Sequence, residues 1–126
     1  MKVMIVDDSA LIRMRLTELL SGIEGVEVVA QAGNAIKALG LMREMAPDVA
    51  IVDVRMPKRS GLELLEDVKK TRKPPKMIMV TNFSTPENRD KCLSRGADFF
   101  FDKSSEIEEV MSLVKELSQD ADDQRR

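Results

Sequence analysis

Five short apolar runs alternate with five longer segments of helical period along this chain of 126 residues, and this alternation limits the folds it can adopt. The apolar runs are rich in Val, Ile, Met and Phe and span residues 3–6, 26–30, 49–52, 77–80 and 98–101. Strict alternation of this kind is typical of βαβ units, whose parallel strands are covered by helices on both faces. Right-handed crossovers leave few strand orders. We therefore predict an α/β protein built on a five-stranded parallel sheet.

Capping residues indicate where the intervening helices begin and end. The predicted N-caps are Ser9, Asn34, Ser60, Thr85 and Ser105. Ser60 and Ser105 are each followed three residues later by a glutamate, which is the pattern of a capping box. Gly22, Pro47, the pair Pro74-Pro75 and Gly96 are predicted to stop the first four helices. We expect the domain to span residues 1–118 and residues 119–126 to form a frayed polar tail, because they carry no apolar stripe.

Carboxylates end two of the apolar runs. Asp7 and Asp8 follow residues 3–6, and Asp53 follows residues 49–52. Aspartate is a poor strand former and is costly to bury, so a strand that stops on one usually presents it at the edge of a sheet. If the two strands are parallel neighbours, the three carboxylates converge. Such a cluster repels itself and needs a divalent cation or an ammonium group nearby.

Two further strands are followed by polar residues at comparable positions. Thr81 comes after residues 77–80, and Lys103 comes shortly after residues 98–101. In open parallel α/β sheets, ligands bind outside the carboxyl ends of the strands, where the strand order reverses. We therefore expect Thr81 and Lys103 to share one site with the three aspartates.

Composition excludes several classes of function. The 20 basic and 22 acidic side chains nearly cancel and the isoelectric point is near 5.3, which argues against direct nucleic-acid binding and membrane association by this chain. The absence of histidine excludes serine and cysteine triads and His-ligated zinc sites as they are usually built. A single cysteine, Cys92, allows no internal disulfide. The N-terminal apolar run is too short for a signal sequence or a membrane span, so a cytoplasmic location is expected.

An ordered set of motifs connects the chain to a known family. Asp7-Asp8, Asp53, Met56-Pro57 followed by Ser60-Gly61, Thr81, and Asp102-Lys103 occur in sequence and at matching spacing. With this set the chain resembles the receiver domain of two-component response regulators over residues 2 to about 118. The resemblance implies a flavodoxin-like, doubly wound (βα)5 fold with strand order 2-1-3-4-5.

The resemblance also implies a function. A sensor histidine kinase would phosphorylate Asp53, and the chain would catalyse only its own phosphoryl transfer and dephosphorylation. Mg²⁺ would be the cofactor, bound by Asp8, Asp53 and the backbone carbonyl of Arg55, with Asp7 as a further member of the metal site. Asp53, Lys103 and Thr81 would be the catalytic residues. Phosphoryl transfer needs charge neutralisation at the transferring group, and Mg²⁺ with Lys103 balances the charge of the three aspartates.

Four residues extend this interpretation. A Thr81 hydroxyl that donates to a new phosphoryl oxygen would move its loop, and the vacated space would admit the ring of Phe100. Ser104 stands where many receivers have a proline, so a trans peptide bond is expected there. The Arg55 guanidinium either pairs with the acidic cluster or points into solvent; in the first case we expect it to compete with Mg²⁺ and to shield the phosphoryl group.

Two other functions stay open at the level of sequence. A phosphohydrolase of the haloacid-dehalogenase type also uses a strand-end aspartate and Mg²⁺, but it wants a second aspartate two residues later, where this chain has Arg55. A protein-binding module that keeps only the fold would not need the acidic set. As a receiver, the chain would act on a downstream protein partner or serve an effector domain outside this sequence.

Overall fold

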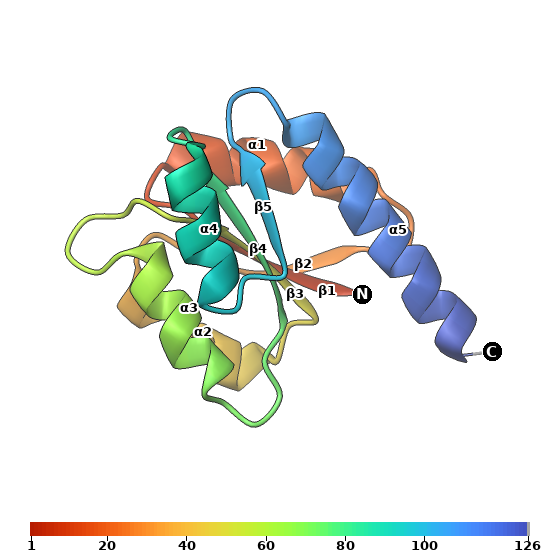
Figure 1. Ribbon diagram of the computed structural model, residues 1–126. Helices are drawn as coiled ribbons and strands as arrows, with labels where there is room; N and C mark the ends of the chain where they lie inside the picture. Colours follow the sequence, from red (N-terminus) through yellow and green to blue (C-terminus); the bar gives the residue numbers. More distant parts are fainter. Residues whose placement is uncertain (126) are drawn as a thin grey trace.

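The computed structural model describes residues 1–125 and contains five strands and five helices in strict alternation (Figure 1). The strands are β1 (Lys2–Val6), β2 (Glu27–Ala32), β3 (Val49–Asp53), β4 (Lys76–Thr81) and β5 (Phe99–Asp102). The helices are α1 (Ala10–Ser21), α2 (Ala35–Met45), α3 (Gly61–Lys69), α4 (Pro86–Ser94) and α5 (Ile107–Arg125). Every predicted strand is present, and the strand ends differ from the prediction by no more than about two residues, as is usual for element boundaries.

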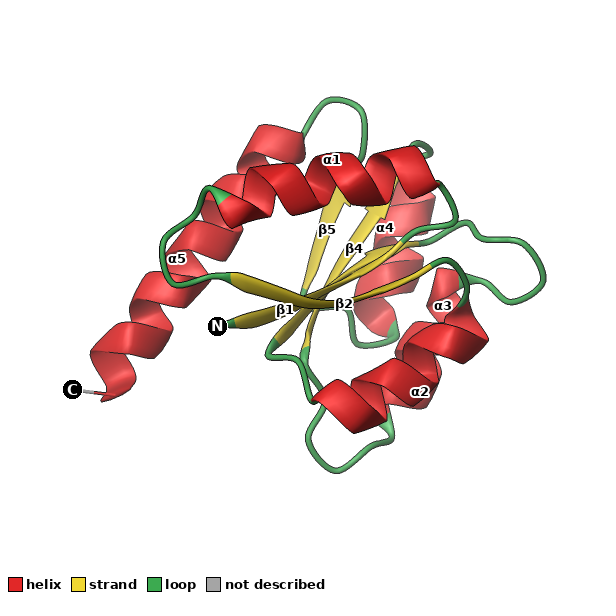
Figure 2. Cartoon of the chain, turned by 180° about the vertical axis from the view of Figure 1, so that it is seen from behind, coloured by secondary structure: helices red, strands yellow, loops and turns green. Residues whose placement is uncertain are grey.

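All five strands are parallel and lie in the order β2-β1-β3-β4-β5, which confirms the predicted topology. β1 and β3 are neighbours, with Val6 beside Val52, so the aspartates that follow these two positions are brought to the same edge. Helices cover both faces of the sheet: α1 and α5 lie on one side, and α2, α3 and α4 on the other (Figure 2).

Two apolar cores, one on each face of the sheet, hold the helices in place. Alternation along β1 sends Met4 into the core under α2, α3 and α4, and Ile5 into the core under α1 and α5. β3 is buried along its whole length, as expected for the central strand of a sheet covered on both sides. In β5, Phe99 and Phe101 face α1 and α5, and Phe100 faces the opposite core, as the alternation predicts.

Four of the five predicted N-caps are confirmed. The side chains of Ser9, Asn34, Ser60 and Thr85 each accept a hydrogen bond from the backbone N–H three residues ahead. The capping box of Ser60 and Glu63 is complete. The second predicted capping box is wrong: α5 begins at Ile107, and the hydroxyl of Ser105 donates to the carboxylate of Asp102 at 3.0 Å. The side chain of Ser105 is therefore engaged by the turn that Asp102 forms, before the helix begins.

Most helix ends follow the predicted stop signals, but the C-terminal tail does not. Gly22 caps α1, and Gly96 follows the C-cap of α4 with a φ of +107°, a conformation that favours glycine. α5 continues to Arg125, so residues 119–125 are helical and the expected frayed tail is wrong for them; residue 126 lies outside the described residues. Packing of Val110 and Val114 nucleates this helix, and each added turn then costs little.

The last turns of α5 project beyond the sheet (Figure 1). Among the described residues, no helix combines the length and the apolar character needed to cross a membrane.

Candidate functional site

The carboxyl ends of four strands bring the polar residues singled out above to one edge of the sheet. Asp7 and Asp8 follow β1, Asp53 ends β3, Thr81 ends β4, and Lys103 follows β5. The strand order reverses between β1 and β3, which is where α/β sheets form their binding crevice.

Three carboxylates form an acidic cluster at this reversal point. Asp7, Asp8 and Asp53 each offer one oxygen, and these oxygens lie within 4.8 Å of one another. Asp7 is 1% exposed and Asp53 is 5% exposed, whereas Asp8 is open to solvent. The cluster therefore has a buried floor and one accessible side, and an unneutralised set of three charges there would repel itself strongly.

Asp7 is held by contacts from three directions. Its N–H donates to the carbonyl of Ala32 at 3.0 Å, and its carboxylate accepts from the N–H of Ser9 at 2.9 Å. The guanidinium of Arg13, on α1, donates to the Asp7 carbonyl at 2.5 Å. Arg13 was not identified from the sequence, because a bond to a backbone carbonyl leaves no motif.

Lys103 supplies the positive charge of the site. Its ammonium lies 2.5 Å from Asp7 Oδ2 and 3.2 Å from Asp53 Oδ2, although 50 residues separate Lys103 from Asp53. Burial by itself would lower the pKa of Lys103, but the hydrogen bond to Asp7 and the charges of Asp53 and Asp7 raise it above its usual value. The two carboxylates therefore favour the charged form of Lys103 in this pocket.

Asp53 lies between one cation and one like charge. Burial raises the pKa of Asp53 above its usual value; Lys103 lowers it, and Asp7 raises it further. Asp53 Oδ2 faces Lys103, and Asp53 Oδ1 accepts a hydrogen bond from the backbone N–H of Arg55 at 3.2 Å. Burial and the neighbouring charge both make the ionised carboxylate less stable. Bonding to an electrophile or binding a cation relieves this unfavourable charge, which is the condition expected of a carboxylate nucleophile.

Gly61 packs directly against the backbone of Asp53. A Cβ atom added to Gly61 would lie 2.1 Å from the Asp53 carbonyl oxygen, so no larger residue fits without moving the end of β3. The Gly61 N–H donates to the carbonyl of Val54 at 2.8 Å and ties the start of α3 to the same segment. Gly61 belonged to the motif set that we identified in the sequence, but this steric role depends on the fold.

The acidic cluster fits a divalent cation. Asp7 Oδ2 is buried, and the contact that the described residues give it is the ammonium of Lys103 at 2.5 Å. Carboxylate oxygens are ligands that Mg²⁺ prefers, and the exposed side at Asp8 leaves room for the waters that this ion retains. The role of the Arg55 carbonyl as a ligand stays a prediction.

Thr81 is buried and lies at the edge of the pocket. Its hydroxyl accepts the N–H of Phe83 at 3.1 Å, and its carbonyl accepts the N–H of Lys103 at 2.8 Å. Phe100 is only 7% exposed, so its ring is already packed in the core. The expected movement of this ring on phosphorylation stays a prediction. The peptide bond before Ser104 is trans, as predicted.

Arg55 is exposed, in keeping with the second of the two orientations considered from the sequence, and its guanidinium also contacts an aromatic ring. The carbon of its guanidinium lies 4.2 Å from the centre of the Phe83 ring, a cation–π contact. This contact joins the loop after β3 to the loop after β4. Phe83 is 51% exposed and had no assigned role, because the two residues are far apart in sequence.

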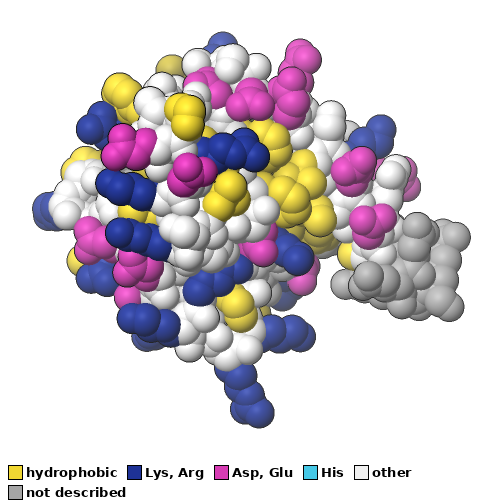
Figure 3. All heavy atoms as spheres, viewed as in Figure 1, with side chains coloured by type: hydrophobic (Ala, Val, Ile, Leu, Met, Phe, Trp, Pro, Cys, Tyr) yellow, Lys and Arg dark blue, Asp and Glu magenta, His cyan; other side chains and the backbone are white. Residues whose placement is uncertain are grey.

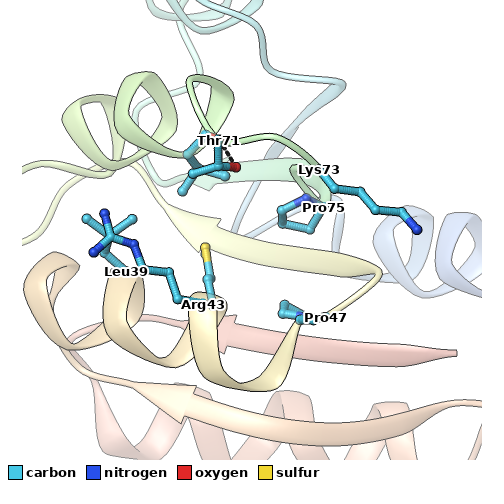
Figure 4. Close-up of a pocket in the computed structure, with 9 residues that line it drawn as sticks. Leu39, Arg43, Pro47, Thr71, Lys73 and Pro75 are labelled. Carbon is cyan, nitrogen blue, oxygen red and sulfur yellow. Dashed lines mark hydrogen bonds between the residues drawn. The ribbon is translucent and has the colours of Figure 1, made fainter.

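A separate cavity lies between α2 and α3. It measures about 180 Å³ and its lining includes Leu39, Arg43, Thr71 and Pro75 (Figure 4). The side chains in Figure 4 come from α2, α3 and the loops that follow them, and the acidic cluster takes no part in the lining. The cavity is therefore distinct from the acidic site.

Known proteins are similar to this chain in both sequence and fold. Residues 3–115 match the family described as the response regulator receiver domain. The response regulator GacA of Pseudomonas aeruginosa is 33% identical over 92% of this chain, and the chain spans about half of that relative, 54% of its length.

Solved structures of receiver domains have the same fold as this chain. The signal receiver domain of the putative response regulator NarL from Mycobacterium tuberculosis superposes with a TM-score of 0.85 at 29% identity, covering 94% of this chain and 95% of that one. A chain of the CheX–CheY–BeF3–Mg²⁺ complex from Borrelia burgdorferi has a TM-score of 0.83 at 25% identity, covering 92% of this chain and 87% of that one. The chain belongs to the response regulator receiver domain family of two-component systems.

Proposed function

We propose that this receiver domain is a switch operated by phosphorylation of Asp53. The observation that carries the proposal is the position of the Asp53 carboxylate, which is almost fully buried at the end of the central strand with the Lys103 ammonium 3.2 Å away. A sensor histidine kinase would supply the phosphoryl group. A carboxylate oxygen of Asp53 attacks phosphorus, the nitrogen–phosphorus bond of phosphohistidine breaks, and the imidazole leaves with a proton.

Charge balance supports this chemistry. Asp7, Asp8 and Asp53 carry three negative charges, which one divalent cation and Lys103 would neutralise. Asp7, Asp8, Asp53 and the Arg55 carbonyl are the groups that would hold Mg²⁺. When bound, this ion supplies positive charge at the phosphoryl oxygens as charge develops on them.

Thr81 and Lys103 would bind the phosphoryl group once it is attached. The Lys103 ammonium already lies beside the Asp53 oxygen that would carry it. The Thr81 hydroxyl accepts a hydrogen bond from Phe83, so its own proton is available to a phosphoryl oxygen. Thr81 ends β4 directly before the loop that leads into α4, and Lys103 lies on the loop that leads into α5. A movement of these two residues toward a phosphoryl group would therefore displace the loops before α4 and α5.

The surface formed by α4, β5 and α5 is the expected output face. β5 is an edge strand, and Figure 3 shows hydrophobic side chains gathered along β5 and the adjoining flank of α5. Phe99, Phe101 and Met111 are partly exposed in this region. An apolar surface of this kind suits a downstream protein partner or an effector domain.

The direct test is phosphorylation by a small phosphodonor in the presence of Mg²⁺. Mass spectrometry should detect one added phosphoryl group, and Asp53→Ala should prevent the addition. Asp90→Ala, on the exposed face of α4, is the matched control and should be labelled like the wild type. Chelation of Mg²⁺ should abolish labelling. Labelling of Asp53→Ala at the wild-type rate would show that Asp53 is not the acceptor.

A further inference from the structure

A second strand-end aspartate, Asp102, gathers hydrogen bonds outside the acidic cluster. Asp102 Oδ1 accepts the backbone N–H groups of Ser104 and Ser105, each at 2.9 Å. The same oxygen accepts the hydroxyls of these two serines at 2.7 and 3.0 Å. An aspartate that binds the backbone two and three residues ahead stabilises a turn, so this half of the carboxylate shapes the loop between β5 and α5.

The other oxygen of Asp102 reaches a different loop. Asp102 Oδ2 accepts the hydroxyl of Ser84 at 2.5 Å, across 18 residues of sequence. Ser84 lies between β4 and α4, three residues after Thr81. Hydrogen bonds to a charged acceptor are short and strong, and those from Ser84, Ser104 and Ser105 hold the pKa of Asp102 well below its usual range.

The backbone joins the same two loops at a second point. The N–H of Lys103, the residue after Asp102, donates to the carbonyl of Thr81 at 2.8 Å. The N–H of Asp102 donates to the carboxylate of Glu106 at 2.8 Å, which anchors the end of β5 to the start of α5. Thr81 and Lys103 therefore sit on loops that share one carboxylate.

We propose that Asp102 is a positioning residue for phosphoryl binding: its carboxylate couples the loop of Thr81 to the loop of Lys103 so that both side chains reach the phosphoryl group together. The inference rests on the proposed function of Asp53. Asp102 touches neither Asp53 nor Asp7 among the described contacts, so it acts through Lys103 and Thr81.

The two oxygens of Asp102 allow this coupling to be separated from simple turn formation. Ser84→Ala removes the side-chain bond between the loops and keeps the donors that form the turn at residues 102–105. The matched control is Ser94→Ala, which removes a hydroxyl that donates to the Lys91 carbonyl within α4. Asp102→Asn keeps an oxygen for the turn and places an amide, able to donate, opposite the Ser84 hydroxyl; it is the conservative variant.

The measurement is the rate of Asp53 phosphorylation by acetyl phosphate with saturating Mg²⁺, as a function of phosphodonor concentration. Ser84→Ala should lower the maximal rate constant about tenfold, the size expected for loss of a hydrogen bond to a charged group. The phosphodonor concentration at half-maximal rate should stay unchanged. Ser94→Ala should match the wild type, and Asp102→Asn should retain more activity than Asp102→Ala.

A double-mutant cycle makes the test specific to coupling. In a Thr81→Ala background, Ser84→Ala should have a clearly smaller effect, because Lys103 is then the one phosphoryl-binding side chain left for the coupled loops to position. A wild-type rate in Ser84→Ala, or its full effect in the Thr81→Ala background, would overturn the inference and leave the proposed function standing. A wild-type chain that accepts no phosphoryl group would remove the proposed function and this inference with it.

Discussion

Asp53 and Asp102 both end a strand at the same edge of the sheet, yet their surroundings give them opposite properties. Asp53 is buried beside Asp7, and the pKa of its carboxyl is raised. Asp102 is partly exposed and receives hydrogen bonds from three serines, and the pKa of its carboxyl is lowered. Position in a strand therefore does not decide what a carboxylate does. The number of hydrogen-bond donors around the carboxylate and its loss of contact with water set the direction of its pKa shift.

The largest expected effect concerns the tight packing at the end of β3, which has no counterpart at Asp102. Gly61→Ala should lower the free energy of unfolding by about 2–3 kcal/mol and slow phosphorylation, because the added Cβ must displace the Asp53 backbone. Gly40→Ala is the matched control: it lies in α2 with open space around it and should be neutral or stabilising by about 1 kcal/mol. Denaturant unfolding measures both. Equal stability of the two variants would contradict the steric role of Gly61.

The second prediction concerns a cation at the cluster that contains Asp53. Mg²⁺ should raise the free energy of unfolding of the wild type by about 1.4 kcal/mol at ten times its dissociation constant, since it binds the folded chain. The gain should largely disappear in Asp53→Asn and persist in Asp102→Asn. Thermal unfolding with and without Mg²⁺ measures it. A gain of the same size in Asp53→Asn would place the cation elsewhere.

The third prediction compares the two aspartates directly without Mg²⁺. Asp53→Asn should stabilise the fold by about 1 kcal/mol, because it removes a buried charge beside Asp7 while Lys103 keeps Asp7 as a partner. Asp102→Asn should destabilise it, because the charged acceptor is lost.

Acid should affect the two variants differently. As the pH falls through the raised pKa of Asp53, protonation removes its charge, and the advantage of Asp53→Asn should shrink. Asp102 has a lowered pKa, so its stabilising contribution is complete above its unfolded pKa and is lost as the pH falls toward its folded pKa. Chemical denaturation between pH 3 and pH 7, on the order of the range in which carboxyls titrate, checks both signs. If Asp53→Asn and Asp102→Asn changed the free energy of unfolding in the same direction at neutral pH, the contrast between the two aspartates would be wrong.

The smallest expected effect is at the rim of the Asp53 pocket. Arg55→Asn should shorten the lifetime of the phosphorylated form about two- to fivefold, which corresponds to an exposed cation–π contact of about 0.5–1 kcal/mol. Phe83→Ala should do the same, because the guanidinium stacks on this ring. Arg72→Asn, on an exposed loop, is the control. Dephosphorylation is followed after removal of the phosphodonor. An unchanged lifetime in both rim variants would leave the contact without a role in hydrolysis.

Local patterns in the sequence were sufficient for the strands and four helix starts, and the family resemblance supplied the strand order. Caps such as Ser9 and Ser60 act over three residues, and hydrophobic alternation acts over two, so both can be read without knowledge of the fold. The capping box expected at Ser105 was wrong because Ser105 belongs to a turn around the Asp102 carboxylate, and that turn depends on the shape of the loop. The tail after residue 118 was wrong because a helix extends easily from a packed turn.

The sequence by itself determined which residues reach the site. A strand that ends on Asp7 or Asp53 delivers its carboxylate to the edge of a parallel sheet, whatever surrounds it. Only the tertiary structure decided how those residues behave. The ammonium of Lys103 between two carboxylates, Gly61 against the Asp53 carbonyl, and Arg55 on the Phe83 ring are contacts between segments far apart in the chain. Burial and electrostatics depend on such distances in space, and these do not follow from spacing along the sequence.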